Sequence, residues 1–128
     1  MPESRMKLGT KGEKRAAKFL KRKGYKIIQR NYRCKLGEID IIARQSDTIV
    51  FVEVKTRQTK DFGAPQDAIT AAKKNHISKV ALCYIKDKNL MGQSCRFDVV
   101  AVDFSPQSRK PKIDHIENAF ELSRRYIY

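Results

Sequence analysis

A glutamate and a lysine interrupt an apolar segment that we predict to be a central strand. Residues 49–52 are Ile, Val, Phe and Val, and Glu53 and Lys55 follow at alternate positions. Alternate residues of a strand lie on the same side of its sheet, and an unpaired charge in a buried strand is costly. The two charges therefore either neutralise each other or belong to a functional site.

The preceding predicted strand carries two further acids, Glu38 and Asp40, which also share one face. A short turn at residues 45–46 would join the strands so that Glu38 lies opposite Glu53 and Asp40 lies opposite Phe51. This register gathers the three carboxylates and the lysine on one face. A slip of one residue would move one strand's charges to the other face, so the prediction depends on the register.

Three clustered carboxylates stay ionised only when positive charge lies between them. Lys55 supplies one charge, and a divalent cation such as Mg²⁺ or Mn²⁺ would supply the rest, because hard cations prefer carboxylate oxygen. Such a cation can polarise a phosphodiester and activate a bound water. We predict that Asp40 and Glu53 bind the metal and that Lys55 orients the attacking water, with Glu38 a weaker candidate. The alternative is a set of structural salt bridges in a β-hairpin.

One acid on a predicted helix could join this site. Glu13 shares a helical face with the small or apolar residues at 16, 17 and 20. It also forms a capping-box pattern with Thr10, which predicts a helix that begins there and ends near Lys23, with Gly24 after its end. The two roles are compatible, and we include Glu13 among the candidate catalytic and metal-binding residues.

A lysine on the second predicted helix, residues 66–86, shows similar placement. Lys73 lies four residues after Ile69 and four before Ile77, on an apolar stripe. Its amine could point inward toward the acids. The alternative is a lysine whose stem covers the edge of the core while its amine stays in water.

The chain is strongly basic, with 28 Lys and Arg against 14 Asp and Glu, a net charge of +14. Residues 5–35 hold thirteen basic residues and one acid, a net charge of +12. Such density attracts polyanions by counterion release, so nucleic acid is the first candidate partner, ahead of an anionic membrane or a merely solvated face. We expect contacts with the nucleic acid from Lys11, Lys14, Arg15, Lys18, Arg57 and Lys73.

The 128 residues are enough for one domain, which we predict to span residues 1–128. The longest apolar run has six residues, against about 20 for a bilayer span. Three distant cysteines favour neither a disulfide framework nor a metal site, and we expect a cytoplasmic protein with no membrane partner. His76 and His115 lack metal-ligand spacing and are predicted at the surface or an edge. Asp98 could pair with Arg96 on the same face.

The predicted elements follow the order α-β-β-β-α-β-β, with strands over residues 25–34, 38–44, 48–57, 96–104 and 113–117. A three-strand meander with a helix at each end, followed by further strands, indicates one mixed sheet with helices packed on it. The fold class is therefore α/β.

These motifs together resemble the YraN-like family of small bacterial proteins. The strongest matches are residues 37–43, GEIDIIA, and residues 51–57, FVEVKTR. The resemblance covers about residues 7–121 and adds Gly12-Glu13 with Ala16, Ala17 and Leu20, Ala68-Ile69-Thr70 with Lys73, residues 96–100 and residues 115–120.

That family is similar to the PD-(D/E)xK nucleases, and in particular to archaeal Holliday-junction resolvases. The resemblance implies a restriction-endonuclease-like αβββαβ core in which Asp40 is the first motif acid and Glu53-x-Lys55 is the (D/E)xK element. Glu13 would match the helical glutamate of the resolvase metal site. The sequence departs from the motif in having Ile39, rather than proline, before Asp40.

The resemblance therefore implies a metal-dependent endonuclease that cleaves DNA rather than RNA, including branched or damaged DNA. Resolving a four-way junction needs two active sites, so that activity would require a homodimer. The alternative is a nucleic-acid-binding protein that retains the nuclease fold without catalysis. A binder has no need of carboxylates near a phosphate, because they would repel it.

Overall fold

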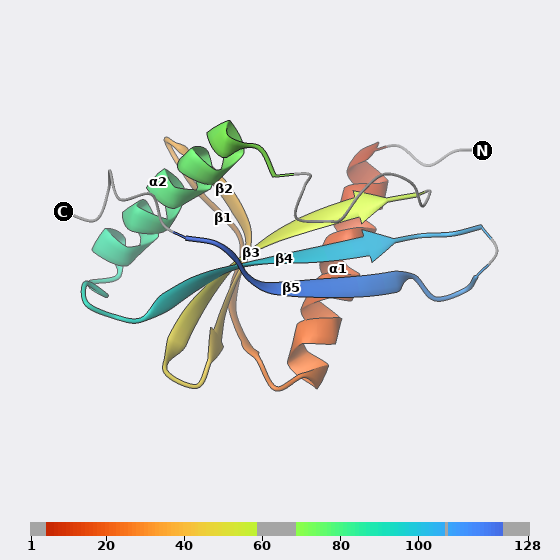
Figure 1. Cartoon of the computed structure of the whole chain (residues 1–128), viewed down its shortest axis with the longest axis horizontal. Coiled ribbons are helices and arrows are strands. Elements are labelled where there is room, and N and C mark those ends of the chain that lie inside the picture. The colour runs from red at the N-terminus through yellow and green to blue at the C-terminus, as the bar shows by residue number, and fades with distance from the viewer. Residues whose placement is uncertain (1–4, 59–68, 107, 122–128) are drawn as a thin grey trace.

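The computed structural model describes residues 5–58, 69–106 and 108–121. Its elements run in the order predicted from the sequence (Figure 1). They are α1 Arg5–Arg22, β1 Lys26–Cys34, β2 Gly37–Gln45, β3 Thr48–Arg57, α2 Ala71–Asp87, β4 Cys95–Asp103 and β5 Lys112–Phe120.

The described strands form one five-stranded sheet in the order β1-β2-β3-β4-β5. Strands β3 and β4 are parallel, and the other neighbouring pairs are antiparallel. Parallel strands cannot be joined by a tight turn, and α2 lies in the connection between β3 and β4. The mixed sheet with two helices confirms the α/β class and is consistent with a restriction-endonuclease-like αβββαβ core.

The two helices cover opposite faces of the sheet, and each packs on its own apolar core. Burial of these side chains supplies the main stabilising free energy, at about 25 cal/mol per Å² of apolar surface. The core under α1 contains Ala16, Ala17, Leu20, Ile41, Ala43, Val50, Val52, Val100 and Val102. The core under α2 contains Ile42, Ile49, Phe51, Ile77, Val80, Tyr84, Phe97, Val99 and Phe120.

Helix α1 is longer than the capping pattern predicts. It already includes Arg5, so Thr10 lies inside the helix and the prediction of Thr10 as its start was wrong. The residues before Thr10 include Met, Lys and Leu, which favour helix. The other end agrees with the prediction, because Gly24 has φ +93° and the Tyr25 N–H donates to Leu20 O at 3.0 Å.

The β2–β3 hairpin has a different register from the predicted one. Ser46 and Asp47 form the turn, and Gln45 pairs with Thr48. Phe51 therefore lies opposite Ile42, and the predicted Phe51–Asp40 and Glu38–Glu53 pairs are wrong. Both turn residues lie one position later than predicted. Each β2 residue therefore pairs with a β3 residue two positions further along the chain than predicted. Past Ile41 and Val52 the two strands are no longer paired, and Ile39 and Ile41 pack in the cores on opposite faces of the sheet, so strand alternation alone does not place the four predicted charges on one face.

Two other elements differ in length from the predictions. Helix α2 begins at Ala71, with Thr70 as its N-cap, because the Thr70 side chain accepts the Lys73 N–H. Ile69 and Thr70 were predicted as helical and are not, while the predicted residues 66–68 lie outside the described part of the chain. Strand β5 extends to Phe120, beyond its predicted end.

Within the described residues, neither helix has the length and apolar character needed to cross a membrane.

Candidate metal centre and nucleic-acid interface

Strands β2 and β3 diverge at one end of the hairpin and leave a fork between them (Figure 1). Their pairing extends from Gln45 and Thr48 to Ile41 and Val52. Beyond that point β2 continues beside β1 to Gly37, while β3 continues beside β4 to Arg57. Asp40 and Glu53 are the first residues past the last pair. The fork therefore separates two strands that both carry acids.

Three carboxylates from two elements meet at this fork. Glu13 of α1 and Glu38 and Asp40 of β2 have oxygen atoms within 4.8 Å of one another. All three are partly buried. Oxygen-only donors in a partly buried group are the ligand type that Mg²⁺ and Mn²⁺ prefer. The residues therefore fit a hard divalent cation, and Glu38, the weaker candidate from the sequence, is one of the three.

Asp40 is held by the backbone of the opposite strand. Its Oδ2 accepts a hydrogen bond from the Val54 N–H at 2.8 Å. Burial and the nearby charge of Glu53 raise the pKa of Asp40 to about 7, against the opposing effect of that hydrogen bond. The charge effect shows that Glu53 is electrostatically linked to the cluster. An added cation would favour the ionised form of this group.

Glu13 reaches the cluster from the inner face of α1. Burial, and after it the charge of Glu38, raises the pKa of Glu13 above its usual range. Oriented with its amide nitrogen toward the acids, Asn31 donates to Glu13 Oε1 at 2.8 Å and to Glu38 Oε1 at 3.0 Å. Asn31 lies on β1 with φ +53°. The sequence signal for this residue is an asparagine, a residue type that is rare in strands, inside a predicted strand.

Glu53 is paired with two lysines. Its Oε1 lies 3.8 Å from Lys55 Nζ and 3.3 Å from Lys73 Nζ. Only 9% of the Glu53 side chain is exposed, so its charge requires partners. Of the two placements that the sequence left open for Lys73, its amine takes the one at the acids, while 45% of its side chain stays exposed. The structure thus brings Lys55 of β3 and Lys73 of α2 to the same acid.

A glycine allows α1 to approach β3 closely beside Glu13. A Cβ atom at Gly12 would lie 1.9 Å from Thr56 Oγ1 and 2.9 Å from Thr56 Cβ. No side chain fits into that space without displacing the helix or the strand. Gly12 therefore determines the position of α1, and with it the position of the neighbouring carboxylate.

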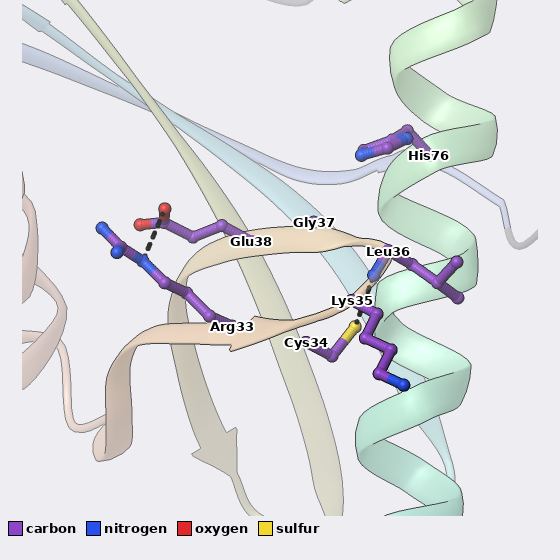
Figure 2. A pocket seen from close by; sticks show the side chains of 7 residues that line it. All are labelled: Arg33, Cys34, Lys35, Leu36, Gly37, Glu38 and His76. Carbon is purple, nitrogen blue, oxygen red and sulfur yellow. Dashed lines mark hydrogen bonds and ion pairs between the residues drawn. The ribbon is translucent and has the colours of Figure 1, made fainter.

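The turn of the β1–β2 hairpin forms a hollow next to the acids. Figure 2 shows its lining residues, with His76 of α2 above the hairpin and the Glu38 side chain directed toward Arg33. The hollow has a volume of about 500 Å³. Arg33 Nε donates to Glu38 Oε2 at 3.1 Å. His76 is exposed, as predicted. Glu38 therefore links this hollow to the carboxylate cluster.

The predicted nucleic-acid-binding residues of α1 lie together. A second hollow, of about 520 Å³, is lined by Lys11, Lys14, Arg15, Lys18, Phe104 and Arg109. The other two predicted residues do not line this hollow, and both have acidic partners. Arg57 donates through Nε and Nη2 to Asp103, at 2.6 Å and 3.1 Å, while Lys73 pairs with Glu53. We call the second hollow the basic hollow.

A buried polar network lies on the α1 side of the sheet. Asp98 is fully buried and accepts hydrogen bonds from Arg96, from His115 Nε2 at 2.7 Å and from the Asn118 N–H at 2.9 Å. The predicted Arg96–Asp98 pair is confirmed. His115 lies on the edge strand β5, which agrees with the predicted edge position, but only 2% of its side chain is exposed, so it is not a surface residue.

This network explains two motifs that the metal site does not use, residues 96–100 and residues 115–120. Lys23 Nζ lies 2.8 Å from His115 Nδ1, and Arg96 donates to the Tyr25 hydroxyl at 2.7 Å. The network therefore ties the end of α1 and the start of β1 to strands β4 and β5. The sequence signal was the alternation of charged and apolar residues in both motifs.

Comparison with known proteins identifies relatives of this chain. Residues 12–102 match the family described as "Uncharacterised protein family UPF0102". A UPF0102 protein of Geobacter metallireducens is 51% identical over 116 residues, or 91% of this chain and 93% of the relative. One from Pelotomaculum thermopropionicum is 42% identical over 120 residues, or 94% of this chain and 100% of the relative. The protein thus belongs to the UPF0102 family, the YraN-like family that its motifs resemble.

Proposed function

We propose that this protein is a divalent-metal-dependent endonuclease that hydrolyses phosphodiester bonds in DNA, including branched or damaged DNA. The observation that carries the proposal is the gathering of Glu13, Glu38 and Asp40 at the fork beside Glu53 and its lysines. A chain with net charge +14 supplies the attraction for a polyanion. The combination of acids and strong positive charge favours chemistry on a phosphate over binding alone.

The residues proposed to hold Mg²⁺ or Mn²⁺ are Asp40, Glu53 and Glu13, with Glu38 as a further oxygen donor. When bound, the cation would polarise the scissile phosphodiester and favour deprotonation of a water. Its presence would also offset the burial and, after it, the mutual repulsion that together raise the pKa of Asp40 and Glu13. Asn31 donates to two of these carboxylates and would keep them oriented.

The lysines would act on the phosphate and the attacking water. Lys55 lies on the same strand as Glu53, two residues further on, and its amine could position the water and offset developing negative charge. Lys73 reaches the same acid from α2. With a phosphate at the fork, its partly exposed amine could contact a phosphate oxygen instead of Glu53. The cations of the basic hollow would hold the nucleic acid nearby.

The test is a cleavage assay on linear duplex, single-stranded, flapped and four-way DNA, and on RNA. Each substrate is incubated with Mg²⁺, with Mn²⁺ and with chelator. Glu53→Ala is expected to abolish cleavage and to leave binding unchanged or tighter, because it removes a metal ligand and a negative charge. Asp87→Ala serves as the control, because Asp87 is an exposed acid on α2. Full cleavage by Glu53→Ala would remove that residue from the mechanism.

One observation favours a second candidate, a nucleic-acid-binding protein without catalysis. Glu53 is already paired with Lys55 and Lys73 in the protein alone, so this acid needs no metal to balance its charge. Salt-sensitive binding to several substrates, with no cleavage of any substrate in either metal, would support the binder. Preferred cutting of four-way DNA would instead predict a homodimer in solution.

A further inference from the structure

We propose that the basic hollow binds an unpaired nucleotide, with its base on the Phe104 ring and its phosphates on the surrounding cations. The nuclease would then act on DNA that has a single-stranded segment next to the cleavage site. This inference rests on the proposed function for its role in cleavage. Its binding step can be tested separately.

The hollow combines cations from distant parts of the chain. Four come from the outer side of α1, and Arg109 comes from the connection between β4 and β5. No acid is among its lining residues. In the described part of the chain, no ion pair joins Lys14, Arg15 or Lys18 to an acid. Its volume of about 520 Å³ lies within the range of pockets that hold small organic ligands.

An aromatic ring beside these cations points to an unpaired base rather than to a duplex. Phe104 directly follows β4, is half-buried, and packs on the core under α1 while it also lines the hollow. A base within a duplex has both faces covered by its neighbours, so it cannot stack on a protein ring without being unstacked. An unpaired base has an open face, and stacking on an aromatic side chain strengthens binding with little sequence preference.

Phe104 is also joined to the strand that carries the candidate catalytic pair. Its N–H donates to Arg57 O at 2.7 Å, at the end of β3. Arg57 lies four residue steps along the extended strand from Glu53, on the order of 13 Å. The adjoining contact of Gly12 with Thr56 keeps α1 against the same strand end. The hollow therefore lies close enough to hold the strand that enters the fork, without occupying the position of the scissile phosphate.

The test measures binding by fluorescence anisotropy with chelator present, so that no cleavage occurs. The probes are a labelled 12-nucleotide oligo(dT) and a blunt duplex of equal length. Phe104→Leu keeps apolar volume against the core and removes the aromatic face. We expect it to weaken oligo(dT) binding about tenfold and to change duplex binding by less than twofold. If Phe104→Leu binds oligo(dT) as tightly as the wild type does, or loses the same affinity for both probes, the proposal is overturned.

Two further variants show whether a loss of binding comes from lost stacking, from lost charge or from a disturbed fold. Phe19→Leu changes a partly buried aromatic of α1 that lies outside the hollow, and both affinities should stay at wild-type values. Lys14→Gln combined with Lys18→Gln should weaken both probes and lower the salt slope by about 1 to 2. An unchanged salt slope would contradict the hollow as a phosphate site. Thermal melts of each variant verify that the chain is folded.

The nucleotide site and the nuclease activity can each be rejected without rejecting the other. If the wild-type protein cuts nothing but Phe104→Leu selectively loses oligo(dT) binding, the nucleotide site is supported and the nuclease is rejected. If the wild-type protein cuts flapped DNA and Phe104→Leu cuts and binds it equally well, the nuclease is supported and the nucleotide site is rejected.

Discussion

Lys73 and Glu53, twenty residues apart in the sequence, bring their Nζ and Oε1 atoms to within 3.3 Å at the fork of the sheet. Helix α2 thus supplies a cation to an acid of β3 whose side chain is almost fully buried. Without a bound metal, this contact and that of Lys55 balance the Glu53 charge. A divalent cation would compete with both lysines for the same carboxylate.

Replacing Lys73 tests this competition. Lys73→Met should lower the free energy of unfolding of the metal-free protein by about 1 kcal/mol, because a mostly buried carboxylate loses one of two partners. The same change should tighten Mg²⁺ binding severalfold in calorimetry, because a competing charge is gone. Lys74→Met is the control, since Lys74 lies over the Phe120 ring rather than at the acids. Weaker Mg²⁺ binding by Lys73→Met would contradict the competition.

The raised pKa of Asp40 predicts a stability change between pH 4 and pH 7. The folded pKa is about 7, above the usual value of about 3.9, so the folded state holds this proton more tightly than the unfolded state. The contribution of Asp40 to the free energy of unfolding is therefore most favourable below about pH 4, and it is lost as the pH rises through 7. Asp40→Asn should therefore stabilise the chelator-treated protein at pH 8, by roughly 2 kcal/mol.

Urea unfolding at pH 5 and pH 8 measures this effect. The asparagine oxygen can still accept the Val54 N–H, so the variant keeps its backbone contact. Added Mg²⁺ should raise the melting temperature of the wild type and not of Asp40→Asn, because the ligand charge is missing. A variant that is less stable than the wild type at pH 8 would show that the Asp40 charge is not repelled in the folded protein.

Asp98 predicts the opposite pH dependence. Burial alone would raise its pKa, but hydrogen bonds from His115, Arg96 and the Asn118 N–H outweigh burial and lower the pKa. A lowered folded pKa gives stability that is present above the usual carboxyl pKa and is lost as the pH falls through the folded value. Asp98→Asn should lower the free energy of unfolding by about 3 kcal/mol at pH 7. It should also make the free energy of unfolding depend less on pH below pH 4.

Chemical denaturation from pH 2 to pH 7 tests the Asp98 prediction. Asp87→Asn is the exposed control and should follow the wild-type curve within about 0.5 kcal/mol. If Asp98→Asn loses no more stability than this control at pH 7, the buried network does not stabilise the fold.

Two glycines of α1 should respond oppositely to alanine. Gly12→Ala should lower the melting temperature and the cleavage rate together, because the new Cβ would overlap Thr56 and displace Glu13. Gly9→Ala has open space around the new atom, so it should stabilise the helix by about 0.5–1 kcal/mol. Melting curves and cleavage rates of both variants are the measurement. Equal behaviour of the two would contradict the close contact at Gly12.

Local patterns in the sequence were sufficient for the element order and for much of the candidate site. The alternation of β3 placed Glu53 and Lys55 on one face, and the helical stripe made an inward Lys73 one of two possible placements. These predictions hold because side-chain direction follows from the period of each element. The prediction of one common face for all four charges did not hold, because Glu38 and Asp40 gather with Glu13 of α1 whereas Glu53 and Lys55 meet Lys73 of α2.

Only the tertiary structure decided which side chains from different elements meet. Asn31 bridges Glu13 and Glu38 because β1 and α1 both reach the fork, and His115 is buried because β5 places it on Asp98. Phe104 joins the cations of α1 because β4 ends beside that helix. Such contacts depend on how helices and strands pack across long sequence separations, and local periodicity carries no information about that packing.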